Sequence, residues 1–373
     1  MKTAIKTDHC LRLCCTAALV SITSAAVAVA VVAVVAVGLV AGQAAGQASA
    51  LGERQVPALF FSHDLIEFTI ETDYGRLRGD RTQDSEYRPA IMRMTDDEGV
   101  ARTIEIRVKT RGNFRLTNCR FPPMRVNFPR SRLGGTVFDG QNGIKLVSHC
   151  RDRDDDEQNI LEEYLVYRTF NLLTDVSFRV RLARVTYADG ADDDDPVIRY
   201  AFFIEEAEAM AERLGMLYFE VERTGARSFG AEGAVRFSVF QYMVGNTDWA
   251  MTGFHNTVFV QNAERVYIPI PYDFDQTGFV STRYATPYPG LGIRNVRQRI
   301  YRGFCRDNFD FSKIYAQFVE IRRDLEVLYT NQEGLEEGNR RDAVEYIDDF
   351  YEDIESPERA RNRLEEDCRP IGN

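Results

Sequence analysis

The chain has 373 residues, with 57 acidic and 46 basic side chains and a formal net charge of -11 at pH 7. This acidic balance excludes nucleic acid as a general partner, because a phosphate backbone repels negative charge. The length suits one large domain or two closely joined lobes.

The first fifty residues carry a hydrophobic segment typical of an export signal or a membrane anchor. Three basic residues precede a stretch without charged side chains, whose Ala/Val-rich core covers residues 25–41. A helix of this length could span a bilayer. Residues 48–50 read Ala-Ser-Ala, which fits the small-residue rule for signal peptidase, so we expect either cleavage before Leu51 or a retained anchor. The protein is thus expected to be exported, as a periplasmic, secreted or membrane-anchored chain that meets a membrane only through residues 1–50.

Three of the seven cysteines lie in this leader, which leaves Cys119, Cys150, Cys305 and Cys368. An even number of cysteines in an exported chain favours disulfides. Four cysteines allow three pairings, and proximity in sequence favours Cys119 with Cys150 and Cys305 with Cys368. Four separate buried thiols are the alternative.

The chain after the leader begins as a predicted sheet. Apolar side chains recur there with a two-residue period, as expected of half-buried strands. The strand segments cover residues 66–70, 104–108, 124–128, 178–182 and 197–204. Between the third and fourth of them, apolar residues recur every three or four positions from Asn159 to Thr174, which predicts a helix packed against the sheet.

The second half is predicted to be mostly helical around one hairpin. Residues 234–244 have a helical pattern, and residues 257–260 and 266–270 form the predicted hairpin. Two prolines then frame a turn into residues 272–275. Apolar residues spaced three and four apart over residues 314–328 predict a helical tail.

Acidic and amide side chains stand at both ends of this hairpin. Asp248 and Asn256 precede its first strand, and Asp273 and Asp275 follow its second. A hairpin would return the second acidic segment beside the first. Phosphoryl transfer from ATP requires a carboxylate facing the acceptor hydroxyl and hard oxygen ligands for Mg²⁺, and these residue types supply both. The same residues are also common as turn and capping residues.

Several segments together resemble the spore coat protein H (CotH) family of atypical protein kinases, over roughly residues 107–278. The similar segments are Arg111-Gly112-Asn113, residues 201–205, residues 246–256 and residues 270–275, where Tyr272 replaces the family's tryptophan. The resemblance implies an enzyme that transfers the γ-phosphoryl group of ATP to Ser or Thr hydroxyls of a protein substrate with Mg²⁺. It also implies roles for individual residues.

On the acidic side, the resemblance implies that Asp248 orients or deprotonates the acceptor hydroxyl. Asn256 and Asp273 would hold Mg²⁺, and Asp275 could complete the shell of metal ligands. These four residues form the predicted catalytic and metal-binding group.

On the basic side, Lys145 would neutralise the ATP phosphates, and Glu163 on the predicted helix would hold that lysine by an ion pair. Lys109 is an equal chemical candidate for the lysine, and Glu162 is a second choice for the acid. Arg111 could clamp phosphate with its planar guanidinium or serve as a structural anchor.

We expect an α+β, atypical protein-kinase-like fold of two lobes within residues 51–373. An antiparallel sheet with one packed helix would form the N-lobe over about residues 51–205. A mixed C-lobe with a helical tail would cover residues 206–373, with ATP and Mg²⁺ bound between the lobes. Two alternatives are a non-catalytic exported scaffold or surface-interaction protein, and a metal-dependent hydrolase that uses the same acids.

Overall fold

The computed structural model describes residues 57–129, 133–191, 195–218, 220 and 223–371. The chain divides into two units, Met1–Gln55 and Val56–Asn373, and the second contains every element described below. The predicted leader and its cleavage position lie outside the described residues.

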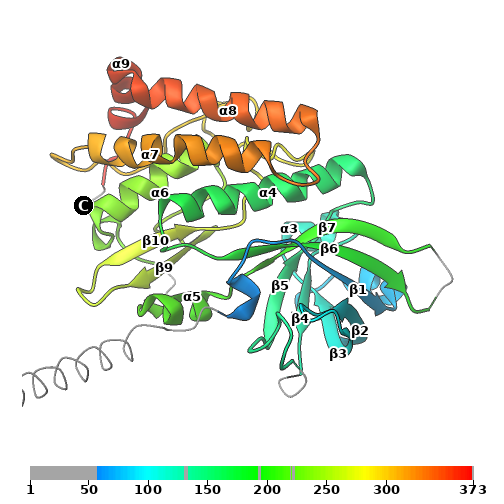
Figure 1. The fold of residues 1–373 in the computed structure, drawn as a ribbon. Helices are drawn as coiled ribbons and strands as arrows, with labels where there is room; N and C mark the ends of the chain where they lie inside the picture. The colour runs from blue at the N-terminus through cyan, green and yellow to red at the C-terminus, as the bar shows by residue number, and fades with distance from the viewer. Residues whose placement is uncertain (1–56, 130–132, 192–194, 219, 221–222, 372–373) are drawn as a thin grey trace, which may run out of the picture. The chain divides into compact units, whose positions relative to one another are not determined.

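A closed barrel of seven strands occupies the first part of the second unit (Figure 1). The strands are β1 (Ile66–Thr72), β2 (Arg88–Thr95), β3 (Ala101–Thr110), β4 (Met124–Asn127), β5 (Gly143–Val147), β6 (Val180–Asp189) and β7 (Val197–Ile204). Their order around the barrel is β1-β2-β3-β4-β5-β7-β6. Neighbours are antiparallel except β1 and β6, which pair in parallel with Ile66 opposite Ala183 and close the barrel.

The expected two-lobed, kinase-like fold with an antiparallel sheet is therefore wrong: the structure has a closed mixed barrel with helices. The physical reason lies in β1, whose alternating buried and exposed residues predict a half-buried strand but not the direction of its partner. The parallel partner β6 comes from a distant part of the sequence.

The barrel interior is filled by side chains from all its strands. Phe68, Phe138 and Phe203 meet there, with ring centroids 5.5 to 5.9 Å apart. The adjacent Phe202 points to the outer face and packs against Tyr167 of the long helix α4 at 5.7 Å. The second half of β7, residues 200–204, is thus buried on both faces, which accounts for its continuous apolar run.

The helices of the second unit are α2 (Tyr74–Gly79), α3 (Phe114–Asn118), α4 (Asp154–Leu173), α5 (Ala207–Leu214), α6 (Ala231–Met243), α7 (Ser312–Thr330), α8 (Glu337–Glu355) and α9 (Pro357–Ala360). Three short helical turns cover Ala58–Phe60, Ala226–Ser228 and Arg361–Glu365. Helix α4 contacts both β7 and α7, and α7 contacts α6 and α8 (Figure 1). One hydrophobic core therefore continues from the outer face of the barrel into the C-terminal helices.

A second sheet of three strands lies against α6. It has the order β10-β9-β8, with β8 (Leu217–Tyr218), β9 (Thr257–Gln261) and β10 (Tyr267–Pro271). Strands β9 and β10 are the predicted hairpin, and their pairing places Thr257 opposite Pro271. The hairpin therefore brings the residues just before β9 beside those just after β10.

Two disulfides join Cys119 to Cys150 and Cys305 to Cys368, which confirms the predicted pairing. Disulfides form and persist in oxidising compartments, so both bonds agree with an exported protein. In the part of the chain that the structure describes, no helix is both long enough and apolar enough to cross a membrane.

Candidate functional site

A cavity of about 380 Å³ brings together all seven residues predicted for the site. Arg111, Lys145 and Glu163 reach it from the end of β3, from β5 and from α4. Asp248, Asn256, Asp273 and Asp275 reach it from the segments that flank the β9–β10 hairpin. Basic groups from the barrel therefore share one cavity with acidic groups from the hairpin.

The position of Asp248 is fixed by an anchored turn after α6. Gly245 ends the helix with φ of 64°, in the left-handed region that favours glycine. The side-chain oxygen of Asn246 then accepts a hydrogen bond from the Asp248 amide at 2.8 Å, which stabilises the turn. The indole of Trp249, 2% exposed, donates to the Asn246 carbonyl at 3.0 Å and anchors the turn in the core.

Three side chains hold the carboxylate of Asp248. His255 Nε2 lies 2.8 Å from its Oδ1, while Asn256 and Gln276 each donate to its Oδ2 at 3.1 Å. Asn256 also donates to the Asp248 carbonyl at 2.8 Å. The bond to Asp248 raises the pKa of His255 against the opposing effect of burial. Asp248 is thus held in one orientation beside Asn256.

The cavity wall contains several residues in the left-handed backbone region. Phe254, Asn256 and Asp273 have φ of 53°, 49° and 62°, and Gly112 has φ of 99°. For a residue with a Cβ this conformation costs on the order of 1–3 kcal/mol, and such residues cluster at functional sites. The wall is therefore strained where the predicted metal ligands lie.

The segment after β10 presents two acids on either side of a buried ring. Phe274 is fully buried and packs against Tyr167 at 4.7 Å between ring centroids. The Tyr167 hydroxyl accepts a hydrogen bond from the Asp273 amide at 2.9 Å, and the Tyr284 hydroxyl donates to Asp275 at 2.9 Å. Burial, reinforced by the charge of Asp273, raises the pKa of Asp275.

The buried acid Glu163 pairs with Arg115, which was not among the predicted residues. Arg115 Nη1 lies 3.1 Å from Glu163, Nη2 donates to the Ser148 carbonyl at 2.6 Å, and Nε lies 4.0 Å from Asp275. Burial raises the pKa of Glu163, and Arg115 opposes this rise. Glu162 faces the other way and accepts a hydrogen bond from Asn339 of α8.

The predicted ion pair between Lys145 and Glu163 is therefore not formed. Among the described residues, the ion-pair partner of Lys145 is Glu206, at 3.7 Å. Burial lowers the pKa of Lys145, and Glu206 partly offsets this. Lys109, the alternative lysine, lies over the ring of Tyr87 at 5.2 Å and does not line the cavity.

The donor set of the cavity fits a hard divalent cation. Asp273 and Asp275 offer carboxylate oxygens, and Asn256 offers an amide oxygen because its nitrogen is bonded to Asp248. Burial and the neighbouring charge of Asp273 raise the pKa of Asp275, and a bound cation would favour the charged form of this carboxyl. As they stand, the described residues hold no group of three or more His, Cys, Asp or Glu side chains arranged as a metal site.

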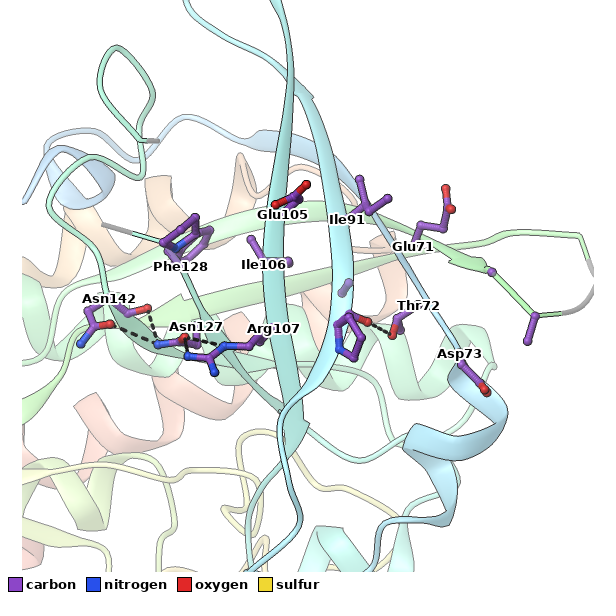
Figure 2. Close-up of a pocket in the computed structure, with 15 residues that line it drawn as sticks. Glu71, Thr72, Asp73, Ile91, Glu105, Ile106, Arg107, Asn127, Phe128 and Asn142 are labelled. Atoms are coloured by element: carbon purple, nitrogen blue, oxygen red, sulfur yellow. Dashed lines mark hydrogen bonds between the residues drawn. The ribbon is translucent and has the colours of Figure 1, made fainter. Parts of the chain in front are cut away.

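A larger groove of about 1010 Å³ lies elsewhere on the barrel, across β1 to β4, and contains none of the predicted site residues. Figure 2 shows Arg107 of this groove bonded to Asn127, which is in turn bonded to Asn142. Unlike this groove, the smaller cavity is lined by all seven residues predicted for the site. The smaller cavity is therefore the candidate site.

A comparison of the chain with known protein families and with curated proteins found no match. Function must therefore be inferred from the cavity itself.

Sequence reasoning missed several residues that shape the cavity. Arg115, His255 and Gln276 line it and bond to its acids. Two of them lie next to predicted residues in the sequence and could have been found there: Arg115 closely follows the Arg-Gly-Asn segment, and His255 directly precedes Asn256. Gln276 had no signal beyond its place after the Asp-Phe-Asp run.

Proposed function

We propose that the cavity catalyses metal-dependent phosphoryl transfer from ATP to Ser or Thr hydroxyls of a protein substrate. The observation that carries this proposal is the meeting, around one cavity, of Lys145 and Arg111 with Asp248, Asp273 and Asp275. Phosphoryl transfer depends mainly on positioning and charge stabilisation, and it requires both kinds of group in one place. The protein acceptor comes from the family resemblance.

The barrel side of the cavity would bind the phosphates. Arg111 presents a planar guanidinium suited to phosphate oxygens, and Lys145 adds a compact positive charge. Gly112 has a positive φ, which glycine adopts readily because it has no Cβ. The missing side chain would also let the backbone approach a ligand closely.

The hairpin side would hold the cation. Asp273, Asn256 and Asp275 carry the oxygen atoms that Mg²⁺ prefers. When bound, Mg²⁺ would neutralise negative charge on the phosphates during transfer. Arg115 would position Asp275 and Glu163 without contacting the substrate.

Asp248 would act as the base for the acceptor. As the hydroxyl oxygen bonds to the γ-phosphorus, the bond from that phosphorus to the β,γ-bridging oxygen breaks and its electron pair leaves with ADP. The hydroxyl proton passes to Asp248, whose orientation is fixed by His255, Asn256 and Gln276.

The test compares Asp273→Asn and Asp248→Asn in the purified chain. Asp273→Asn should weaken Mg²⁺-dependent binding of an ATP analogue, because the amide lacks the charge that offsets the phosphates. Asp248→Asn should keep binding but lower phosphoryl transfer by on the order of 10² or more. Asp348→Asn, at an exposed ion pair on α8, is the matched control and should change neither.

Labelled phosphate transfer to a mixed protein substrate and product analysis separate the remaining outcomes. If the unmodified chain neither binds nucleotide nor transfers phosphate, the non-catalytic scaffold is favoured. If phosphate is released to water with no phosphorylated product, the hydrolase is favoured. If Asp273→Asn unfolds the protein, Asp273 is a structural turn residue and its assignment as a ligand is wrong.

A further inference from the structure

A second cavity, of about 450 Å³, lies beside the disulfide that follows α3 and has an aromatic wall. The wall consists of Tyr74, Phe121, His149 and Tyr187. Phe121 stacks on His149 with ring centroids 4.5 Å apart and meets Tyr187 edge-on at 4.8 Å. Tyr74, His149 and Tyr187 are buried behind Phe121, which is only partly buried, so Phe121 is the ring that a planar ligand can reach from the cavity.

Charged side chains surround this wall. The arginines and aspartates that line the cavity are Arg78, Arg120, Arg151, Arg153, Asp152, Asp189 and Asp195. Arg78 lies 3.9 Å from Asp189. Arg120 and Arg151 are exposed and form no ion pair within the described ranges. Two guanidinium groups are therefore available for an anion, which they bind with well-defined geometry.

Two polar atoms of the aromatic wall are buried without a partner. Nδ1 of His149 and the hydroxyl of Tyr187 make no hydrogen bond to any described residue, and these side chains belong to residues that are 1% and 3% exposed. Burial lowers the pKa of His149 to about 3, so the ring is neutral. Buried polar groups are normally paired, and a polar ligand atom or a water in the cavity would supply the missing partner.

The disulfide holds the wall and the arginines together. Arg120 and Phe121 directly follow one cysteine, and His149 and Arg151 flank the other. The Phe121 amide also donates to the carbonyl of Cys150 at 3.0 Å. A site whose two sides are covalently linked is ordered before a ligand arrives, which favours binding.

We propose that this cavity binds a small planar organic anion, either a carboxylate or a phosphate monoester. Its ring would lie against Phe121, which His149 supports from behind, and its anionic group would be held by Arg120 and Arg151. The site is separate from the phosphoryl-transfer cavity, with which it shares no lining residue. The proposal therefore stands whether or not phosphoryl transfer is shown.

The test titrates the purified, oxidised full-length chain with phenyl phosphate, with benzoate and with neutral benzyl alcohol, by calorimetry. At least one anion should bind at a ratio of one to one, at least about tenfold more tightly than benzyl alcohol. Binding of phenyl phosphate alone identifies a phosphate monoester as the ligand class, and binding of benzoate alone identifies a carboxylate. The double variant Arg120→Ala/Arg151→Ala should weaken the binding by about tenfold or more.

Two control variants locate the bound anion. Arg76→Ala removes an exposed arginine of α2 that does not line the cavity, and Lys145→Ala alters the phosphoryl-transfer cavity; neither should change the affinity. The proposal is overturned if neither anion binds, if the double arginine variant binds unchanged, or if Lys145→Ala abolishes the binding. A fold control by thermal melting should show all variants folded.

Discussion

Replacing Arg115 with methionine should show how strongly the fold depends on charge compensation in the candidate site. The guanidinium lies 3.1 Å from Glu163 and 4.0 Å from Asp275, and the three side chains are only 9%, 3% and 8% exposed. When the guanidinium is removed, water therefore cannot solvate the negative charges of Glu163 and Asp275. Removing one partner of a buried ion pair costs about 3–5 kcal/mol, so we expect the free energy of unfolding to fall by this amount at alkaline pH.

The cost should depend on pH in a direction set by the two acids. Burial raises the pKa of both Glu163 and Asp275, so each binds its proton more tightly in the folded than in the unfolded chain. Stability therefore falls as pH rises from the unfolded pKa, about 4, through the folded pKa. Loss of Arg115 raises both folded pKa values further, so the variant keeps losing stability at higher pH, by up to about 1.4 kcal/mol per pH unit for each carboxyl.

Urea unfolding with the disulfides intact, at about pH 6 and about pH 9, measures both effects. Arg76→Met is the matched control, because Arg76 pairs with Asp73 at 3.1 Å on the surface and its loss should cost less than about 1 kcal/mol. The double variant Arg115→Met/Glu163→Gln should recover part of the loss, since it leaves no unpaired Glu163 charge. A loss no larger than that of the control at about pH 9, or one that does not grow with pH, would refute the reasoning.

Binding of Mg²⁺ should strengthen as pH rises, because burial raises the pKa of Asp275 and the cation must displace its proton. Titrations with Mg²⁺ at about pH 6.5 and about pH 8.5 measure this, and equal affinities would contradict it. Replacing both Cys305 and Cys368 with serine should lower the free energy of unfolding by about 4 kcal/mol in the chain-entropy model. Chemical denaturation of the variant and of the oxidised parent measures this difference, and an unchanged midpoint would contradict it. Gly278→Ala should destabilise by about 1–3 kcal/mol, because an added Cβ would overlap a backbone carbonyl and a tyrosine hydroxyl. Gly338→Ala, on a helix with open space at its Cβ, is the control and should be neutral or stabilising; equal melting temperatures for the two variants would contradict the overlap.

Local elements could be predicted from periodicity, but their closure into a barrel could not. Residues 197–204 were predicted as a strand and form β7 with the same bounds. Helix α4 begins at Asp154, five residues before the predicted start. The prediction missed its first turn because that turn is acidic and has no apolar pattern. Acidic residues nevertheless suit a helix N-terminus. Strand β2 alternates Ala90, Met92 and Met94, residue types with weak strand preference, and had no clear signal.

The acidic half of the candidate site could be predicted because it is local. The pairing of the β9–β10 hairpin brings Asn256 and Asp273 together, and the anchored turn that precedes the hairpin adds Asp248. The basic half depends on long-range placement. The sequence does not show which basic residue pairs with Glu163. In the fold, Arg115 on α3 forms this ion pair, and Lys145 on β5 pairs with Glu206 instead.

The parallel pairing of β1 with β6 has a consequence for the time course of folding. Ile66 pairs with Ala183, so β2 to β5 and α4 all lie between the two partners in sequence. Contacts between such distant segments form slowly, because a long loop must close before they contribute any stability. The first strand of a nascent or newly translocated chain therefore waits with one edge open until β6 arrives. During that interval it is exposed to pairing with other chains, and we expect the yield of folded protein to depend on chain concentration during refolding.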